Sequence, residues 1–317
     1  MIPLITSIIA ITLSAGTSLV YATIGEIYTE RSGILNLGIE GMMLMSAVTA
    51  FATAFHTGSL LLAVLMAMLV GMLLALIHAF LSITMHANQV VSGLSITLFG
   101  TGLASFLGQR LGPESNGFNL SGMSAVKFTR FQVEGLGDIP LLGAVFNQGP
   151  LTYIVYLLIP VAWYFMYKTK FGLNLRSVGE NPQTADAMGL NVTKIRYLYT
   201  IFGGMLVGIG GAHLSLAYTP GWTENITGGR GWIVIALVIF SMWNPSRAIL
   251  GAILFGGINA VQFRLQASGT DIPSAYLNMA PYVATIVVLV LVTVWESHNR
   301  KVGPPAALGT SYMREDK

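Results

Sequence analysis

The chain has 317 residues, of which 29 are charged (16 Lys and Arg with 13 Asp and Glu), or 9%, while 54% are hydrophobic. An ordinary soluble domain carries roughly 25% charged residues, so this composition excludes a water-soluble enzyme, a disordered chain and a nucleic-acid-binding protein as the main body. The net charge is +3 and no cysteine is present, which excludes disulfides, thiolate metal sites and a cysteine nucleophile.

Nine hydrophobic runs are candidates for membrane spans. Because hydrocarbon offers backbone groups no hydrogen-bonding partner, these runs predict helices. The predicted fold is all-α, a polytopic transmembrane helical bundle of eight to ten spans, with nine as the best count. The first run lacks the basic start of a signal peptide, since the first Lys or Arg is Arg31, and we expect it to be retained. The runs cover residues 2–24, 34–55, 60–83, 90–108, 151–167, 197–217, 231–243, 248–266 and 278–295.

The distribution of basic residues predicts the orientation of the spans, because short loops rich in Lys and Arg stay in the cytosol. Residues 168–196 hold five basic residues against two acids and are expected to form a cytosolic loop. Residues 109–150 hold three of each sign and lie one span away, so we expect them outside. The spans would then form a single transmembrane domain, residues 1–295, followed by a cytosolic tail, residues 296–317. The N-terminus is expected outside, unless an early re-entrant segment inverts that end.

Polar residues inside spans are costly and are therefore candidates for a translocation path. Asn36 and Glu40 lie four residues apart, which would place them on one helix face. Arg31 or a helix N-terminus is the expected partner of the Glu40 carboxylate. Two interpretations stay open for this pair, an element of the path and a hydrogen bond at a packing seam. Asn88 and Gln89 open the fourth run and are further path candidates.

The loop at 168–196 contains a predicted short helix. Asn181 followed by Pro182 is a typical helix start, because the Asn side chain accepts a free backbone N–H and proline lacks only a donor that is unused there. Gly189 stands where a left-handed residue closes a helix. A helix of about seven residues is unstable alone, so it either docks on another protein or is only a capped connector between spans. In the next span, Gly204 and Gly208 have the spacing of closely packed helices.

Five stretches of the chain carry a resemblance to a known family. The loop SVGENPQTADAMGLNVTKIR with the following span FGGMLVGIGGAHLSL resembles the cytosolic-loop signature of permeases of ATP-binding-cassette importers, in the branched-chain amino acid and ribose permease superfamily. The tail GPPAALGTSYMRE resembles the end of the nucleoside and simple-sugar subgroup. Three further stretches match in order, ERSGILNLGIEGMMLMSA, ANQVVSGLSITLFGTGL and GGRGWIVIALVIFSMWNPSRAILGAILFGG, so the resemblance covers nearly the whole chain.

The resemblance implies a transport subunit without enzymatic activity or a bound cofactor of its own, with ATP on a separate ATPase subunit. The sequence agrees, since none of its six lysines follows a glycine and no phosphate-binding G-x-x-x-x-G-K-[ST] motif exists. In the family the short loop helix seats in the ATPase. That role carries over to the segment from Glu180 to Gly189. Its principal residues are expected to be Glu180, Asn181, Pro182, Ala185, Asp186 and Gly189.

The implied partners are ATPase subunits, a second related permease (a heterodimer), an extracytoplasmic solute-binding protein and membrane lipid, in the cytoplasmic membrane of a prokaryote. The implied solute is a nucleoside or a simple sugar. An ion-coupled secondary transporter is the main alternative, and it requires partnered acids at mid-membrane, for which only Glu40 qualifies. An intramembrane enzyme is less favoured, because His78, His213 and Glu40 lie on separate runs without a catalytic motif.

Overall fold

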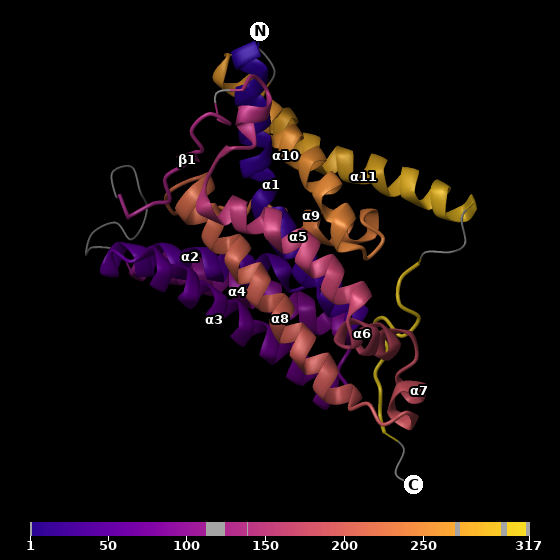
Figure 1. The fold of residues 1–317 in the computed structure, drawn as a ribbon. Coiled ribbons are helices and arrows are strands. Elements are labelled where there is room, and N and C mark those ends of the chain that lie inside the picture. Colours follow the sequence, from indigo (N-terminus) through magenta and orange to yellow (C-terminus); the bar gives the residue numbers. More distant parts are fainter. Residues whose placement is uncertain (1, 112–123, 138, 270–272, 299–302, 315–317) are drawn as a thin grey trace.

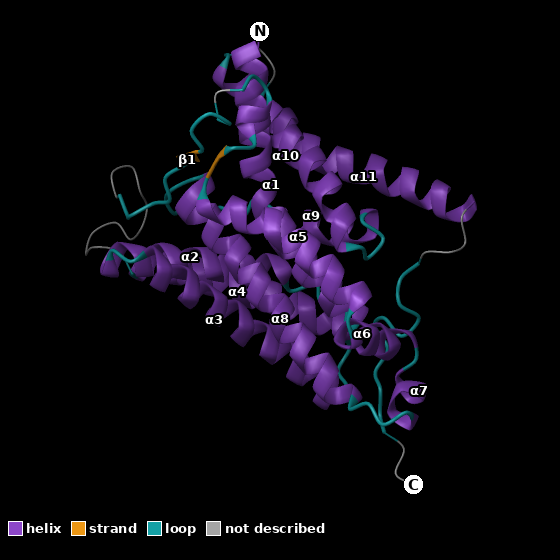
Figure 2. Ribbon diagram, in the orientation of Figure 1, coloured by secondary structure: helices purple, strands orange, loops and turns teal. Residues whose placement is uncertain are grey.

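The structure is a computed structural model that describes residues 2–111, 124–137, 139–269, 273–298 and 303–314. It is an all-α bundle with one minimal pair of strands (Figures 1 and 2). The helices are α1 Ile2–Arg31, α2 Ile39–Thr57, α3 Leu60–Ala79, α4 Gln89–Arg110, α5 Pro150–Lys168, α6 Lys170–Glu180, α7 Pro182–Ala187, α8 Val192–His213, α9 Arg230–Phe240, α10 Pro245–Ala267 and α11 Ser274–His298, and the strands are β1 Phe131–Gln132 and β2 Asn147–Gln148.

Each of the nine predicted runs corresponds to a helix. Among the described residues, seven helices are long and apolar enough to cross a membrane. The other two runs correspond to α9, which has 11 residues, and to α11, whose apolar part covers Ala275–Val290. The chain is therefore a multi-pass membrane protein, and nine is an approximate count of its crossings.

The N-terminal helix α1 lies at the centre of the bundle (Figure 1). It packs against α8 and α10 along most of its length and against α9 and α5 over shorter stretches. Two tyrosines hold α5 on it, since the Tyr21 hydroxyl donates to the Leu151 carbonyl at 2.8 Å and the Tyr28 hydroxyl to the Ala162 carbonyl at 2.7 Å. The first element of the chain is thus the axis on which later elements assemble.

Helices α3 and α8 meet along a seam of small residues. A Cβ atom added to Gly204 would lie 2.4 Å from the Gly71 carbonyl oxygen, and one added to Gly208 would lie 2.4 Å from the Ala67 carbonyl oxygen. Both distances are shorter than side chains tolerate, so the two backbones touch only because these positions are glycine. The close packing predicted from the Gly204 and Gly208 spacing is confirmed, and α3 is the partner helix.

Three segments depart from regular α-helical geometry. Residues 32–38 between α1 and α2 are not helical, so Asn36 precedes the start of α2 at Ile39. The prediction that Asn36 and Glu40 share a helix face is wrong, because the chain unwinds at Ser32–Gly33 and re-enters a helix only after Gly38. Helices α3 and α8 each end in a π-helical turn, Phe80–Thr84 and Leu214–Tyr218.

The predicted extracytoplasmic segment 109–150 contains the two short strands. They pair antiparallel, with Phe131 opposite Gln148 and Gln132 opposite Asn147. Residues 112–123 and 138 of this predicted segment lie outside the described residues. At the opposite end of the bundle, the predicted loop 168–196 folds into α6 and α7, and the C-terminal segment runs beside them (Figure 1). The amphipathic helix α6 is not among the predicted elements.

Candidate translocation and coupling sites

The unwound segment 32–38 is held in place by buried polar groups of three helices. The Asn36 backbone N–H donates to Glu26 Oε1 at 3.2 Å, and its side-chain Nδ2 donates to Glu26 Oε2 at 3.3 Å. From α4, Gln89 Oε1 accepts from the Leu35 N–H at 2.7 Å, and from α3 the His78 Nε2 lies 3.1 Å from the Leu35 carbonyl oxygen. The backbone groups that leave the helix therefore find partners inside the protein, as a membrane interior requires.

Glu40 joins the N-terminus of α2 to the N-terminus of α9. Its Oε1 accepts from the Thr227 hydroxyl at 2.6 Å and from the Gly229 N–H at 3.0 Å, and its Oε2 accepts from the Gly231 N–H at 2.6 Å. Of the two predicted partners, the structure therefore has the helix N-terminus, where a carboxylate is electrostatically favoured. Arg31 lies elsewhere and donates to the carbonyl oxygen of Trp243 at 3.3 Å.

Helix α9 begins halfway along the bundle. The Arg230 Nη1 donates to the carbonyl oxygen of Ala15, in the middle of α1, at 3.1 Å. At the other end of α9, the Trp243 indole N–H donates to Glu30 Oε2, near the end of α1, at 2.5 Å. Glu40 therefore lies at mid-depth beside a helix that spans only half of the bundle.

A cavity of about 310 Å³ adjoins this mid-depth site. Its polar lining comes from three helices, and the Arg230 guanidinium also lies 4.9 Å from the centre of the Tyr218 ring. On α10, Asn259 and Gln262 are buried three residues apart. The sequence analysis missed them, although polar side chains inside an apolar run were the available signal. The polar residues of the lining are Thr227, Arg230, Asn259, Gln262 and Tyr282.

The two remaining path candidates, Asn88 and Gln89, differ in position. Asn88 is exposed and caps α4, accepting from the Val91 N–H at 3.1 Å. Gln89 is buried and bridges α4 to the unwound segment, as described above. The predicted break before α4 is present, since residues 85–88 are not helical. The structure thus brings Gln89, Asn36 and Glu40 to the same region of the bundle and leaves Asn88 at its surface.

The predicted loop helix is α7, and both of its predicted caps are present. Asn181 Oδ1 accepts from the Thr184 N–H at 2.9 Å. At the other end, the Leu190 N–H donates to the Ala185 carbonyl at 3.0 Å and the Gly189 N–H to the Asp186 carbonyl at 2.9 Å. This pair of bonds is a Schellman motif, and Gly189 has the positive φ of +86° that the motif needs.

The two faces of α7 differ in what they contact. Pro182 and Ala185 are buried, and Ala185 packs against Val178 of α6 and Val192 of α8. The opposite face is exposed, and Met188 at its end is 80% exposed. A large apolar side chain so exposed beside a rigid helix is a typical contact for another protein. The sequence analysis missed Met188.

The C-terminal segment 303–314 packs on α6, on α7 and on the bundle. The Ala307 N–H donates to the Gly179 carbonyl at 2.9 Å, and the Gly309 N–H donates to the Gly33 carbonyl at 3.1 Å. The Ala306 N–H donates to Glu180 Oε2 at 3.3 Å. The segment therefore connects the C-terminal end of α6 with the start of the unwound segment.

Farther along, the same segment forms one wall of a second cavity. Arg314 pairs with Asp186 at 3.2 Å, and a cavity of about 470 Å³ lies between these residues, Tyr312 and the start of α8. Burial and the hydrogen bond to Asp186 raise the pKa of the Tyr312 phenol above its usual value. The exposed face of α7 and this cavity form one continuous surface, which we call the coupling surface.

Comparisons with known proteins give concordant results. A family model described as "Branched-chain amino acid transport system / permease component" matches residues 8–295. A Haloferax volcanii protein assigned as a glucose ABC transporter permease is 39% identical, with 96% of each chain covered. The nucleoside ABC transporter permease of Lactococcus lactis is 35% identical, over 97% of this chain and 96% of its own. The guanosine ABC transporter permease of Bacillus subtilis is 33% identical, over 91% and 92%.

The fold also resembles a solved structure. An inward-facing conformation of an ABC transporter of metal-chelate type matches with a TM-score of 0.52 and 18% identity, covering 91% of this chain and 85% of that chain. At this identity the likeness concerns the fold alone.

Proposed function

This chain belongs to the family of permease components of branched-chain amino acid transport systems, and from that premise we propose its solute, its partners and the surface through which ATP drives it. The chain is the membrane-spanning permease subunit of an ABC importer. We propose that it contributes no ATPase chemistry, and that the ATP is bound and hydrolysed by a separate cytosolic subunit.

The observation that carries the coupling proposal is the rigid construction of α7. Its N-terminus is capped by Asn181, its C-terminus is closed at Gly189, and its inner face packs on α6 and α8. A helix of six residues transmits a displacement only if both of its ends are fixed. The exposed Met188 and the coupling surface then meet the ATPase, and α8 carries the motion into the bundle.

We assign the translocation path to the mid-depth region around Glu40. The bonds from Glu40 to Thr227, Gly229 and Gly231 connect α2 to the half-length helix α9. Because both helices begin there, a rigid-body shift of either one opens or closes this junction without unwinding a span. The unwound segment held by Asn36 and Gln89 lies between this junction and the cytosolic end.

The proposed solute is a nucleoside or a simple sugar. Two of the similar permeases are named for guanosine or nucleosides, and a third is assigned to glucose. The cavity beside Arg230 supports the proposal, because its amide, hydroxyl and guanidinium groups suit a solute rich in hydroxyl groups. Among the described residues that line the cavity itself there is no carboxylate, so the ammonium group of a branched-chain amino acid would find no ion-pair partner among them.

The proposed complex contains two ATPases, a second related permease and an extracytoplasmic solute-binding protein, in the cytoplasmic membrane of a prokaryote. Helices α3 and α4 support the pairing of two permeases, because each presents a broad exposed apolar face to lipid or to a neighbouring subunit. We propose a heterodimer, and we place residues 168–196 and the tail on the cytosolic side. The extracytoplasmic placement of residues 109–150 follows from that orientation.

The decisive experiment is transport by the complex reconstituted in vesicles. Uptake of labelled guanosine and of labelled glucose is measured with ATP, without ATP, and without the ATPase subunit. We expect uptake of one solute, dependent on both ATP and the ATPase. Uptake that persists without the ATPase and collapses with an ionophore would instead establish the ion-coupled secondary transporter.

A matched pair of variants tests the coupling surface in the same vesicles. Met188→Arg changes the exposed end of α7, and the control Leu142→Arg changes an exposed apolar residue of the segment 109–150, at the opposite end of the bundle. We expect Met188→Arg to reduce both co-purification of the ATPase and uptake, with normal membrane insertion. Unchanged co-purification in Met188→Arg removes α7 from the docking surface.

A further inference from the structure

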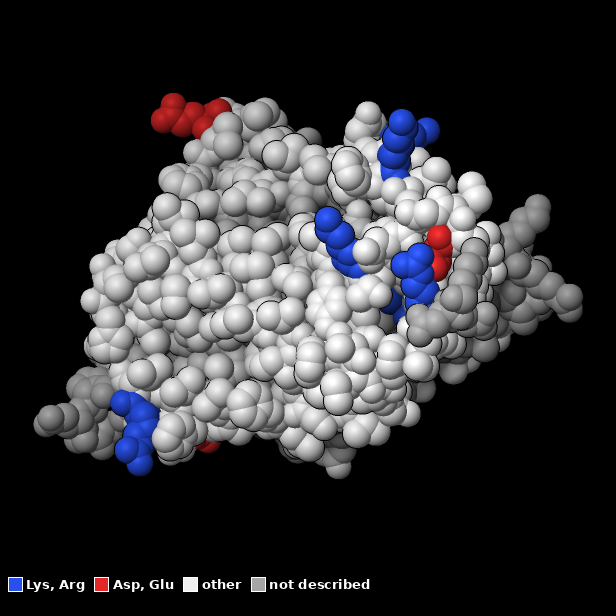
Figure 3. Space-filling view, turned by 90° about the horizontal axis from the view of Figure 1, so that it is seen from below, with Lys and Arg blue, Asp and Glu red and all other residues white. Residues whose placement is uncertain are grey.

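A basic pocket lies at the cytosolic end of the seam between α5 and α10. It has a volume of about 300 Å³ and is lined by three cations, Arg31 from α1, Lys168 from α5 and Arg247 from α10. Two aromatic residues of α5, Trp163 and Tyr167, form its side. None of the described residues that line it is acidic. Figure 3, which views the molecule from that end, shows several blue basic side chains and few red acidic ones on a mostly uncharged surface.

The cations of this pocket have no carboxylate bound to them. Arg31 donates to the Trp243 carbonyl at 3.3 Å, Arg247 lies 2.9 Å from a methionine sulfur, and the Lys168 ammonium lies 5.8 Å from the centre of the Trp163 ring. Within the described part of the chain, the ion pair of Arg314 and Asp186 is the only one, and it lies at the coupling surface. The nearby Glu30 bonds the Trp243 indole. The three cations thus retain donors for an anion.

A fourth cation supports the same interpretation. Arg176 of α6 places its guanidinium 5.1 Å from the centre of the Tyr167 ring. Its Nε is buried and has no hydrogen-bond partner. Arg176 does not itself line the pocket, and its positive charge beside Tyr167 adds to the positive potential around it.

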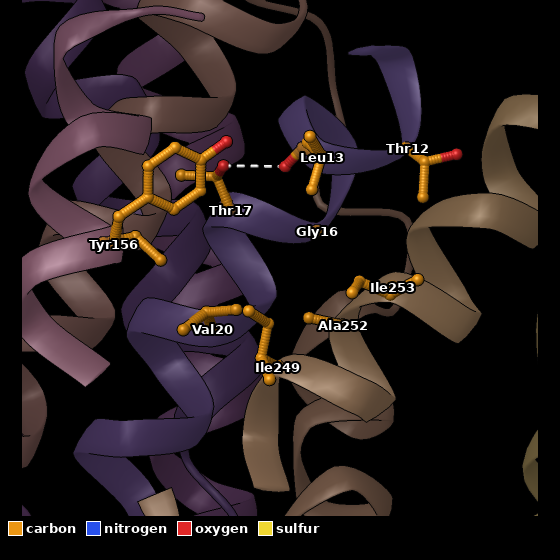
Figure 4. A pocket seen from close by; sticks show the side chains of 10 residues that line it. Thr12, Leu13, Gly16, Thr17, Val20, Tyr156, Ile249, Ala252 and Ile253 are labelled. Carbon is orange, nitrogen blue, oxygen red and sulfur yellow. Dashed lines mark hydrogen bonds between the residues drawn. The ribbon is translucent and has the colours of Figure 1, made fainter. Parts of the chain in front are cut away.

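Above the pocket, the same seam continues as a narrow apolar groove between α1, α5 and α10. Figure 4 shows Tyr156 of α5 on one side of it and Ile249 and Ile253 of α10 on the other, while its polar Thr17 already donates to the Leu13 carbonyl. At 1.5 Å per helical residue, the residues that line the groove lie about 3 to 9 Å from Arg247 along α10 and about 18 to 20 Å from Lys168 along α5. The groove therefore lies on the membrane-interior side of the basic pocket.

We propose that this seam binds one anionic phospholipid of the cytosolic leaflet. Its phosphate lies among Arg31, Lys168 and Arg247, and its acyl chains lie along the exposed apolar side chains of α5 and α10 beside the groove. Basic pockets at the cytosolic end of helices, bordered by Trp and Tyr, have the chemistry that phosphate headgroups require. The site lies on the central helix α1 and on two helices that pack against it, α5 and α10, so its occupant would stabilise their packing. The leaflet assignment rests on the orientation proposed above, whereas the lipid chemistry does not.

The test is native mass spectrometry of the full purified chain with dioleoyl phosphatidylglycerol or dioleoyl phosphatidylcholine. We expect one phosphatidylglycerol to be retained and phosphatidylcholine to be released. The double variant Lys168→Gln with Arg247→Gln should weaken phosphatidylglycerol binding about 30-fold, since each basic residue near the surface contributes about fivefold. Lys170→Gln, a cation outside the pocket on α6, is the matched control and should bind normally.

Further arms distinguish a lipid from a soluble anion. Inorganic phosphate and dihexanoyl phosphatidylglycerol are added as competitors, and neither should displace the long-chain lipid at equal concentration. Displacement by phosphate alone overturns the proposal in favour of a soluble anion. Equal weakening in Lys170→Gln overturns it in favour of unspecific attraction to charge. Neither result depends on the transported solute or on the ATPase, so the proposed function is tested separately.

Discussion

Glu40 shows how one side chain determines the arrangement of two helices. It accepts three hydrogen bonds from the segment that starts α9, two of them from backbone N–H groups. The carboxylate therefore replaces the missing first turn of a helix that begins inside the bundle. A neutral side chain at this position has fewer acceptor sites for the same donors.

We expect Glu40→Gln to lose at least one of these bonds. A hydrogen bond to a charged group contributes about 1.5 to 3 kcal/mol, so the apparent melting temperature of the purified chain should fall, and ATP-dependent uptake should fall with it. Thr227→Val removes one donor and keeps the carboxylate, and it should have a smaller effect. Full thermal stability in Glu40→Gln would show that the α2 to α9 junction does not depend on this carboxylate.

Glycine at the seam of α3 and α8 gives a second test at single-residue level. Gly204→Leu places a side chain against the Gly71 carbonyl, and overpacking of this kind costs about 1 to 3 kcal/mol or more. Gly102→Leu is the matched control, because Gly102 of α4 has open space around its Cα. We expect the first variant, measured by thermal aggregation in detergent, to be destabilised and the second to behave as the parent chain.

At this scale the sequence predicted what depends on neighbours along the chain and missed what depends on distant contacts. The caps Asn181 and Gly189 are local, and both predictions are confirmed. The shared helix face of Asn36 and Glu40 was wrong, because hydrophobic periodicity does not reveal where buried donors support an unwound segment. The bond between Glu40 and Gly231 joins residues 191 positions apart, and no local pattern indicates it.

Among the elements, the C-terminal segment packs on the bundle more closely than its composition suggests. It has no helix or strand, yet backbone bonds join it to Gly33 and Gly179. It therefore links the unwound segment after α1 with α6, the helix that precedes α7. Sequence patterns predict regular elements through periodicity, and they therefore predicted the membrane helices. They indicated neither the contacts of this extended segment nor the amphipathic helix α6.

The contacts of this segment predict different effects for two variants. Arg314→Ala removes an ion pair with a 77% exposed arginine, and such pairs contribute at most about 1 kcal/mol. Deletion of residues 303–317 removes several hydrogen bonds of about 1 kcal/mol each. We expect Arg314→Ala to leave the ratio of ATP hydrolysed to solute transported nearly unchanged, and the deletion to raise it about tenfold or more. Equal ratios in the parent chain and the deletion variant would exclude the segment from coupling.

For the whole molecule, the main question is which end of the bundle faces the cytosol. The distribution of charge predicts an orientation, and single introduced cysteines can test it because the chain contains no cysteine. Composition predicts an approximate number of crossings. It does not predict that α9 spans only half of the bundle, because a short apolar run is compatible with a buried helix as well as with a span.

We predict that single cysteines report the orientation. Gln183→Cys lies on the exposed face of α7, and Thr223→Cys lies in an exposed turn near the opposite end. In intact spheroplasts, a membrane-impermeant maleimide should label Thr223→Cys and leave Gln183→Cys unlabelled, and both should react after lysis. The reverse pattern would invert the orientation, and the cytosolic assignment of α7 would then be wrong.

The central position of α1 also has a consequence for how the chain is made. Glu30 in α1 and Glu40 in α2 find their partners 213 and about 190 residues later. At translation rates of about 5 to 20 residues per second, the Glu30 partner emerges about 10 to 40 s after Glu30 itself. During biogenesis the first two helices therefore wait in or beside the bilayer with incomplete polar contacts. The insertion machinery would then have to shelter them until α9 and the segment after it arrive.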